Sequence, residues 1–535
     1  MAQAADPATS DAHGVTAPDV DVSKAAASNF TTFHSPADRT VAPSGAKGKK
    51  ASPQAEGLTA GAEPEVELKA KGLSAHGIKL DAIVTSDPGT ALGVYIEWGD
   101  GTTNQIGANG SATVSLDHTY SEIGAYTIKV SLIDGAGGGI RGTNEMVIAT
   151  PGSDFTPHTP TRLLDTREGI GAAKGKVKGF GTTRVKIDGN GKIPVGATAV
   201  VLNVTVTNPT KAGHITVYGE GDDRPTTSNV NFEAGQTVPN LVIVPVGENG
   251  YVELYNHGTD SVDLIADVTG YFTRTQSSGY TPLNPARLVD SREGTGTGKG
   301  FVPGFGTFTT QISGRGGVPA GATAVALNVT VTEPKADGHL TVFPGGQATP
   351  ATSSLNFTTG QTVANSVIVP ISADGKINIR NGSWAATHVI ADVVGYYSPG
   401  STSAYLPVLP ERLLDTRGDE HWNYGPLQGF EYLYMPLAWN DPNITGFALN
   451  ATVTNTTDNG HLTVSPDPNS KYQYDSRTAE WPVKPNSSNL NWTTGKTVPN
   501  LVQASTGANG IIDFWNWSPG NTDVIVDIFG YYDKG

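Results

Sequence analysis

From residue 65 onward, the chain consists of short segments in which hydrophobic and polar residues alternate. In Leu202–Thr207, every second residue is Leu or Val, and the residues between them are Asn or Thr. A period of two places the hydrophobic side chains on one face of an extended strand. Turns rich in Gly, Pro and Asn separate the segments, and these short connections leave no room for crossover helices. The pattern predicts an all-β chain of tandem antiparallel β-sandwich or jelly-roll-like domains.

Residues 1–64 have a different composition. They are rich in Ala, Ser, Pro, Asp and Thr and show neither the strand period nor the helix period. Such a segment buries too little apolar surface to order itself, so we expect a flexible or extended N-terminal arm. Ala2-Gln3-Ala4-Ala5 is what cleavage of an export signal would leave, with Met1 supplied for expression. A native start without a leader is the alternative.

Residues 65–150 carry short alternating strands broken by Gly and Asp turns, which is typical of a small sandwich. Trp98-Gly99-Asp100-Gly101 is followed by His118-Thr119-Tyr120 and by Gly124-Ala125-Tyr126-Thr127. These strings resemble the polycystic-kidney-disease (PKD) domain. The resemblance implies an immunoglobulin-like sandwich that serves as a spacer or adhesive module. Asp100 has the chemistry of a Ca²⁺ ligand, but Asp-Gly pairs form turns more often, and we expect a turn.

The rest of the chain contains three copies of one unit. The string Arg162–Arg167 (RLLDTR) returns at Arg287–Arg292 and Arg412–Arg417, 125 residues apart each time. Strings of the forms N-x-T-V-T, G-H-x-T-V and G-x-T-V-x-N follow it in every copy. This period is too long for a solenoid turn or a propeller blade, so each copy is a domain. The expected β repeat domains are residues 151–274, 279–398 and 404–535.

These strings are similar to the tandem repeat found in secreted proteins of Streptomyces and related actinobacteria. The resemblance covers residues 155–532 and implies an extracellular, surface-associated setting without indicating an activity. The linkers 273–279 and 398–404 are short and rich in Ser, Thr and Gly. Such linkers are compatible with domains that pack against one another and with domains that do not.

Composition narrows the classes of function. The chain has 535 residues, a formal net charge of −15 and no Cys. An acidic surface repels phosphate backbones, so we expect no nucleic-acid partner. No apolar run reaches the roughly 18 residues that span a bilayer, so we expect no membrane insertion. The absence of Cys excludes disulfides, thiolate metal sites and a Cys nucleophile.

A carboxylate recurs in the middle of each apolar terminal strand. Because an unpaired buried carboxylate is costly, each one needs a cation. We expect Arg162 or Arg167 to pair with Asp267 across the first and last strands, and we favour this structural pairing over a ligand site. The residues assigned to such ion pairs are Arg162, Asp165, Arg167, Asp267, Arg287, Asp290, Arg292, Asp392, Arg412, Asp415, Arg417 and Asp527.

His214, His339 and His461 each stand directly before a strand. One His per domain, without a second His or Cys at ligand spacing, argues weakly for a metal. We therefore expect turn histidines that hydrogen-bond backbone, and no metal. The sequence contains no G-x-S-x-G elbow, H-E-x-x-H pair or Walker loop. We expect no cofactor and no enzyme activity, with a hydrolase of unfamiliar type as the alternative.

The third copy differs from the other two. After Arg417 its Gly-rich loop is replaced by residues 418–424, and an insertion occupies residues 469–485. Six of the 8 Trp residues follow residue 400. Aromatic side chains beside Asn and Asp can stack on sugar rings or anchor protein interfaces, and burial in a core is the alternative. The candidate ligand-binding residues are Trp422, Tyr424, Tyr472, Tyr474 and Trp481.

These features favour a non-catalytic extracellular protein, secreted or attached to a cell surface, that adheres to cell-envelope or matrix glycan through its C-terminal repeat. Repetition would add avidity, because linked weak sites gain effective concentration. The alternative is a structural component of an extracellular assembly, such as a virion decoration, a tail appendage or a surface fibre. In that case the arm would bind neighbouring subunits. The ligand and the oligomeric state stay open.

Overall fold

The computed structural model describes residues 13–15, 32–35, 63–418 and 422–535. Within this part of the chain it contains β-strands and a single short helix, α2 (Lys471–Asp475). The chain divides into two compact units. The smaller unit comprises residues 27–153 with 274–276 and 535, and the larger comprises residues 1–26, 154–273 and 277–534. The predicted all-β fold class is confirmed.

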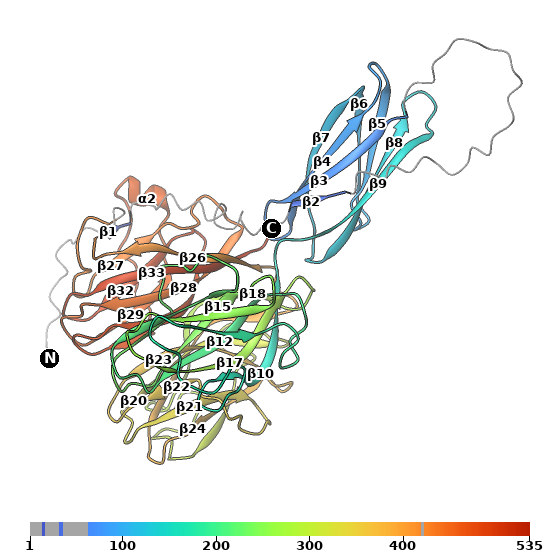
Figure 1. The fold of residues 1–535 in the computed structure, drawn as a ribbon. Helices are drawn as coiled ribbons and strands as arrows, with labels where there is room; N and C mark the ends of the chain where they lie inside the picture. Colours follow the sequence, from blue (N-terminus) through green and yellow to red (C-terminus); the bar gives the residue numbers. More distant parts are fainter. Residues whose placement is uncertain (1–12, 16–31, 36–62, 419–421) are drawn as a thin grey trace, which may run out of the picture. The chain divides into compact units, whose positions relative to one another are not determined.

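The smaller unit is a sandwich of two four-stranded sheets (Figure 1). Hydrophobic side chains between the sheets form one core, which includes the fully buried Trp98. One sheet has the order β2-β3-β4-β7 and the other β6-β5-β8-β9. The strands are β2 (Thr32–His34), β3 (Glu65–Gly72), β4 (Gly77–Thr85), β5 (Ala91–Glu97), β6 (Thr103–Asn109), β7 (Ala112–Thr119), β8 (Ala125–Asp134) and β9 (Ile140–Ala149).

Asp100 holds the turn that follows β5. Its Oδ1 accepts hydrogen bonds from the Thr102 backbone N–H at 2.9 Å and from Thr102 Oγ1 at 2.6 Å. Its Oδ2 lies 2.8 Å from His118 Nε2, and the His118 ring stacks on Trp98. Burial raises the pKa of Asp100, but the hydrogen bonds from Thr102 and His118 outweigh burial and lower it. The Asp100 carboxylate therefore stabilises the turn.

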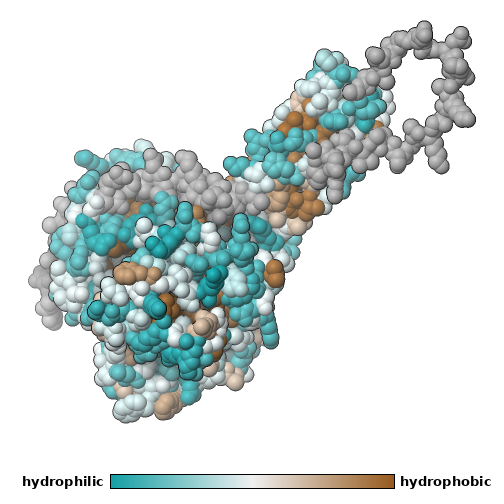
Figure 2. Space-filling view, viewed as in Figure 1, coloured by the Kyte–Doolittle hydropathy of each residue, from teal (hydrophilic) through white to brown (hydrophobic). Residues whose placement is uncertain are grey.

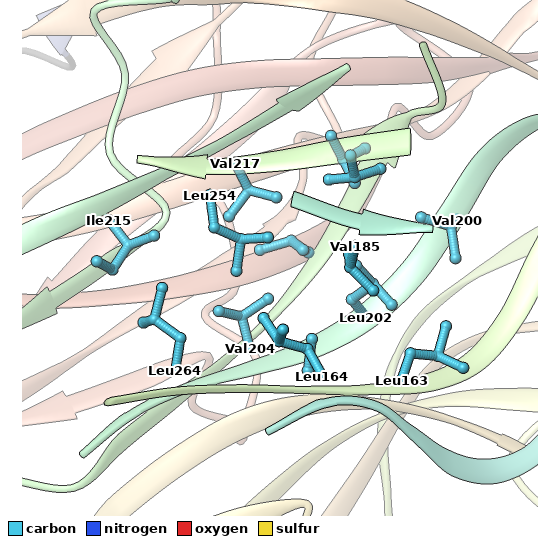
Figure 3. Packing of buried hydrophobic residues seen from close by; sticks show 14 of the residues in the cluster. Leu163, Leu164, Val185, Val200, Leu202, Val204, Ile215, Val217, Leu254 and Leu264 are labelled. Carbon is cyan, nitrogen blue, oxygen red and sulfur yellow. The ribbon is translucent and has the colours of Figure 1, made fainter. Parts of the chain in front are cut away.

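Each repeat of the larger unit is also a sandwich of two four-stranded sheets. In the first repeat the sheets are β10-β17-β12-β15 and β11-β16-β13-β14. Figure 3 shows the core between them, where Leu202 and Val204 of one sheet face Val217 and Leu254 of the other. The strands are β10 (Asp154–Asp165), β11 (Thr182–Lys186), β12 (Ala197–Thr207), β13 (Gly213–Gly219), β14 (Val230–Phe232), β15 (Val238–Pro245), β16 (Tyr251–Asn256) and β17 (Asp263–Thr273).

The second and third repeats keep this strand order. The second repeat contains β18 (Gly279–Asp290), β19 (Thr307–Gln311), β20 (Ala324–Thr332), β21 (Gly338–Pro344), β22 (Leu355–Phe357), β23 (Val363–Pro370), β24 (Lys376–Asn381) and β25 (His388–Ser398). The third contains β26 (Ala404–Asp415), β27 (Tyr432–Met435), β28 (Ile444–Thr454), β29 (Gly460–Pro466), β30 (Leu490–Trp492), β31 (Val498–Ser505), β32 (Ile512–Trp517) and β33 (Asp523–Asp533).

The three repeats pack against one another around a shared hydrophobic core. In each repeat, one sheet directs aliphatic and aromatic side chains away from its own sandwich and toward the other two repeats. The core members are Phe155, Ala199, Val201, Leu241, Ile243, Phe272, Tyr280, Ala324, Ala326, Ile368, Val394, Tyr397, Tyr405, Ala448, Leu501 and Tyr532. The repeats therefore touch and form one body, and they are not independent beads.

Buried asparagines link the repeats in a closed ring. The Asn365 amide of the second repeat donates to Asn203 Oδ1 of the first at 2.9 Å, and Asn203 donates to the Ser353 carbonyl at 2.7 Å. The same pairing joins the third repeat to the second and the first to the third, through Asn500 with Asn328 and Asn240 with Asn450. The recurring N-x-T-V-T and G-x-T-V-x-N strings thus build the contacts between repeats.

Two short segments of the N-terminal arm are extended as strands. β1 (His13–Gly14) pairs in parallel with β27, and the Val15 N–H donates to the Tyr434 carbonyl at 3.0 Å. β2 pairs with β3 in the smaller unit. Val15 is buried. Existing sheet edges supply the hydrogen bonds and apolar contacts that the arm lacks on its own.

The visible face of each unit is mostly hydrophilic, with small separate hydrophobic patches (Figure 2). Scattered apolar patches of this kind are normal on soluble protein surfaces. Binding chemistry therefore has to be sought in particular clusters of side chains.

Candidate functional site

The expected ion pair across the first and last strands is made by Arg162. Strand pairing sets Arg162 opposite Asp267, and the guanidinium donates to both carboxylate oxygens at 2.9 and 3.2 Å. Burial raises the pKa of Asp267, and Arg162 acts in the opposite direction. The second and third repeats repeat the pair as Arg287 with Asp392 and Arg412 with Asp527.

Arg167, the other candidate for this pair, binds Asp165 instead. Its Nε and Nη2 donate to the two oxygens of Asp165 at 2.9 and 2.7 Å, and the backbone N–H of Arg167 also donates to that carboxylate. Because Arg167 follows Asp165 by two residues in a turn, its side chain folds back and does not cross to the last strand. The equivalent pairs are Arg292 with Asp290 and Arg417 with Asp415.

The first arginine of the string also reaches the neighbouring repeat. Arg162 Nη2 lies 3.3 Å from the Ala351 carbonyl of the second repeat, and Arg287 Nη2 lies 3.2 Å from the Asn486 carbonyl of the third. The RLLDTR string therefore contributes to the contacts between repeats as well as to the ion pair within each repeat.

Two of the three recurring histidines are held by rings, which differs from the expected bonding to backbone. His214 stacks on His257 with ring centres 4.2 Å apart, and His461 stacks on Trp517. Burial and nearby Arg412 and His257 lower the pKa of His214 to about 4. Burial, Lys484 and Arg287 lower the pKa of His461 to about 4 as well. Both rings are therefore neutral at neutral pH.

Two of the five predicted ligand-binding aromatics are structural. Trp422 is only 4% exposed, and its Nε1 donates to the Gly425 carbonyl. Tyr474 stacks on Tyr434 with ring centres 3.7 Å apart, and its hydroxyl donates to Asp467. Both side chains pack within the third repeat, so neither has a ring face available to a ligand.

Tyr424 and Trp481 are exposed but separate. Tyr424 is 57% exposed and packs edge-on against Trp422. Trp481 is 48% exposed and lies edge-on to the buried Tyr432, with ring centres 4.9 Å apart. Each contributes one ring face to the surface, and no cavity of the described residues brings the two together.

The fifth candidate, Tyr472, lines a groove that also contains Trp439. The groove encloses about 950 Å³ between the second and third repeats. Ser470 caps α2 by accepting a hydrogen bond from the Gln473 N–H, and this fixes the helix that carries Tyr472. Tyr472 and Trp439 are 77% and 49% exposed. Two aromatic ring faces are thus available to a ligand in one concave site.

Polar groups lie beside these rings. The Lys471 ammonium is 5.4 Å from the centre of the Trp439 ring and 2.8 Å from Asp475 Oδ1. Asp441 and Thr281 also line the groove. Trp439 is one of the six Trp residues after residue 400 and is not among the five predicted ligand-binding aromatics. Strand β28 and the turn before it bring Trp439 to α2.

A pair of buried carboxyl groups lies below this surface. Asp467 and Asp513 are 2% and 0% exposed. Burial and the neighbouring Asp467 raise the pKa of Asp513 well above its usual value. Burial and the hydrogen bond to Asp467 likewise raise the pKa of Tyr474. Asp513 is therefore neutral over a pH range where an exposed Asp is charged. Neither residue belongs to a recurring string, so the pair could not be predicted from the sequence.

Replacing Asp513 by Asn should make the fold less sensitive to pH. The folded carboxyl holds its proton to a higher pH than the unfolded one, so it stabilises the fold below about pH 4, and this contribution is lost as pH rises. Relative to wild type, Asp513→Asn should gain up to about 1.4 kcal/mol of unfolding free energy per pH unit above pH 4, until the folded pKa is passed. Urea unfolding at several pH values measures this gain.

A wild-type profile that Asp513→Asn does not alter would contradict the raised pKa.

Across the described residues, no group of three or more His, Asp or Glu side chains is arranged to hold a metal ion. In the same part of the chain, no helix is long and apolar enough to cross a membrane.

No protein-family model and no curated protein matches the chain. Three solved structures show a weak likeness. One, from "The Triple Jelly Roll Fold and Turret Assembly in an Archaeal Virus", is 9% identical with a TM-score of 0.16 and covers 71% of this chain and 89% of that one. A structure of the Sulfolobus Turreted Icosahedral Virus is 9% identical with a TM-score of 0.15, and the match covers 71% of this chain and 91% of that one. The tandem CBM22 domains of Paenibacillus barcinonensis Xyn10C are 10% identical with a TM-score of 0.15, and the match covers 44% of this chain and 98% of that one. Likenesses this low carry no functional argument.

Proposed function

We propose that this chain is a non-catalytic extracellular protein that binds glycan in the groove between its second and third repeats. The observation that carries the proposal is the pair of exposed rings, Trp439 and Tyr472, in one groove of about 950 Å³. In this proposal the smaller unit acts as a PKD-like spacer.

The chemistry of the groove suits a sugar ring. Aromatic faces contact the apolar C–H face of a sugar, while polar side chains around them bind its hydroxyls. Lys471, Asp475 and Asp441 supply a donor and acceptors beside the two rings. Because Trp and Tyr have few rotatable bonds, little conformational entropy is lost when they are held against a ligand.

The buried carboxyl pair supports a binding role without catalysis. A general acid and base have to reach the bond that reacts. Asp467 and Asp513 are 2% and 0% exposed, and the hydroxyl of Tyr474 covers Asp467. These groups therefore stabilise the third repeat and are not placed to contact a bound saccharide.

Replacing Trp439 by Ala is expected to abolish most glycan binding. Loss of one stacking ring should weaken affinity at least about tenfold, which corresponds to about 1.4 kcal/mol. A glycan array of bacterial-envelope and matrix saccharides, probed with the full chain, measures this. Trp384→Ala is the matched control, because Trp384 is 74% exposed on the second repeat and does not line the groove.

Two results would count against the proposal. One is an array on which Trp439→Ala binds as wild type does, and the other is an array without any bound saccharide. If the array is silent and light scattering shows an oligomer that Val15→Asp dissociates, the structural-assembly alternative takes precedence, because Val15 holds the arm strand β1 in place.

A further inference from the structure

Three exposed phenylalanines occupy the same place in the three repeats. Phe180, Phe305 and Phe430 each follow a Gly and are 125 residues apart. They are 62%, 57% and 56% exposed. Each has a left-handed backbone, with φ of 58°, 57° and 62°. A bulky side chain is unfavourable in that conformation. Of the three rings, Phe430 packs edge-on against Trp517, with ring centres 5.8 Å apart.

The fold requires this backbone but has no need of the ring. In the second repeat, the buried Asn381 amide donates to the Val302 and Pro303 carbonyls just before Phe305. The Phe305 N–H donates to the Ser383 carbonyl at 2.9 Å. A Gly at position 305 would take the same backbone without strain. A strained exposed aromatic that recurs three times therefore indicates a contact with another molecule.

Phe305 lies in a second groove, which encloses about 530 Å³ between the first and second repeats. Arg162 and Arg167 of the first repeat line it, together with His339 and Arg380 of the second. This groove is separate from the one that contains Trp439.

An unpaired buried hydroxyl also lines this groove. Thr205 is 2% exposed, and its Oγ1 has no hydrogen-bond partner among the described residues. The equivalent Thr330 and Thr452 hydroxyls are unpaired as well, so this feature belongs to the fold of every repeat.

The groove also holds a cation that is not neutralised. Arg380 has no carboxylate partner in the described part of the chain, and its hydrogen bond is to Thr307 Oγ1 at 3.5 Å. Strand pairing sets Arg380 opposite Thr341, and the equivalent positions in the first and third repeats are Tyr255 and Trp515. The second repeat therefore has a cation at a strand position where the other two have aromatic rings.

We propose that the groove between the first and second repeats binds an acidic saccharide unit. Phe305 stacks on the sugar ring, and Arg380 receives the carboxylate. This site shares no residue with the groove of Trp439 and Tyr472, so the two proposals stand or fall separately.

Titration calorimetry of the full chain with tetragalacturonate tests this site, with the fully methyl-esterified tetramer as the uncharged probe. Esterification, Phe305→Gly and Arg380→Ala should each weaken binding at least tenfold. Phe305→Gly should not lower the melting temperature, because Gly accepts the left-handed backbone. Phe301→Ala is the control: Phe301 is exposed on the same repeat but packs on His388, outside the groove.

The proposal is overturned if the acid and its ester bind equally, if neither binds, or if Phe305→Gly and Arg380→Ala bind as wild type does. A Phe305→Gly variant with unchanged binding and a lower melting temperature would assign Phe305 a structural role instead. Loss of binding to the glycan array in Trp439→Ala leaves this test unaffected.

Discussion

Replacing Arg162 by Met should lower the free energy of unfolding of the larger unit by about 3–5 kcal/mol. Arg162 makes two hydrogen bonds to Asp267, whose side chain is 1% exposed, and one to Asp165. Its removal leaves a buried carboxylate without a counterion. It also removes the hydrogen bond to Ala351 of the second repeat. Urea unfolding of the full chain measures the loss.

The pH dependence identifies the cause of this loss. Without Arg162 the pKa of Asp267, already raised by burial, should rise further, because the opposing effect of the guanidinium is gone. A protonated Asp267 needs no counterion, so the variant should lose less stability at pH 4 than at pH 8.

Arg184→Met is the matched control. Its side chain is 60% exposed and pairs with Glu220 at 3.4 Å, so the substitution should cost no more than about 1 kcal/mol. An Arg162→Met variant that melts at the wild-type temperature would contradict the assigned role.

Replacing Ile368 by Asp should lower the melting temperature of all three repeats together. Ile368 is fully buried in the core that the repeats share. A buried charge without a partner costs several kcal/mol, and the side chains that make up that core are hydrophobic. Because the repeats share one core, scanning calorimetry should show a single transition for them, displaced as a whole in the variant.

Val195→Asp is the control for this experiment, since Val195 is 82% exposed and should leave the transition in place. Separate transitions for the three repeats, of which Ile368→Asp moves only the second, would contradict the shared core.

The alternating pattern predicted the strands well because one face of each strand packs in its own sandwich. It did not predict the packing of the repeats against one another. The signal lay in Ala199–Leu202 at the start of β12, where four successive hydrophobic residues interrupt the alternation. Both faces of that strand are buried, which is what a continuous hydrophobic run indicates. The spacing of repeats fixes no arrangement in space, so the interface could not be derived from it.

Residue type identified part of the candidate site. Tyr472, an aromatic residue of the insertion, lines the groove. Trp422, an aromatic residue of the replaced loop 418–424, is buried. Whether a loop aromatic seals its own loop or faces solvent depends on tertiary packing. Trp439 and Phe305 were missed because only the folded chain shows a neighbouring ring or a left-handed backbone.

Glycan binding in the groove of Trp439 and Tyr472 is tested by titration calorimetry with the oligosaccharide that binds most strongly on the array. The full chain, Trp384→Ala and the double variant Trp439→Ala/Tyr472→Ala are compared at one pH and salt concentration. We expect equal Kd values for the full chain and Trp384→Ala. The double variant should bind at least a hundredfold more weakly, which corresponds to about 2.7 kcal/mol. Equal affinity in all three would show that the groove between the second and third repeats does not bind glycan.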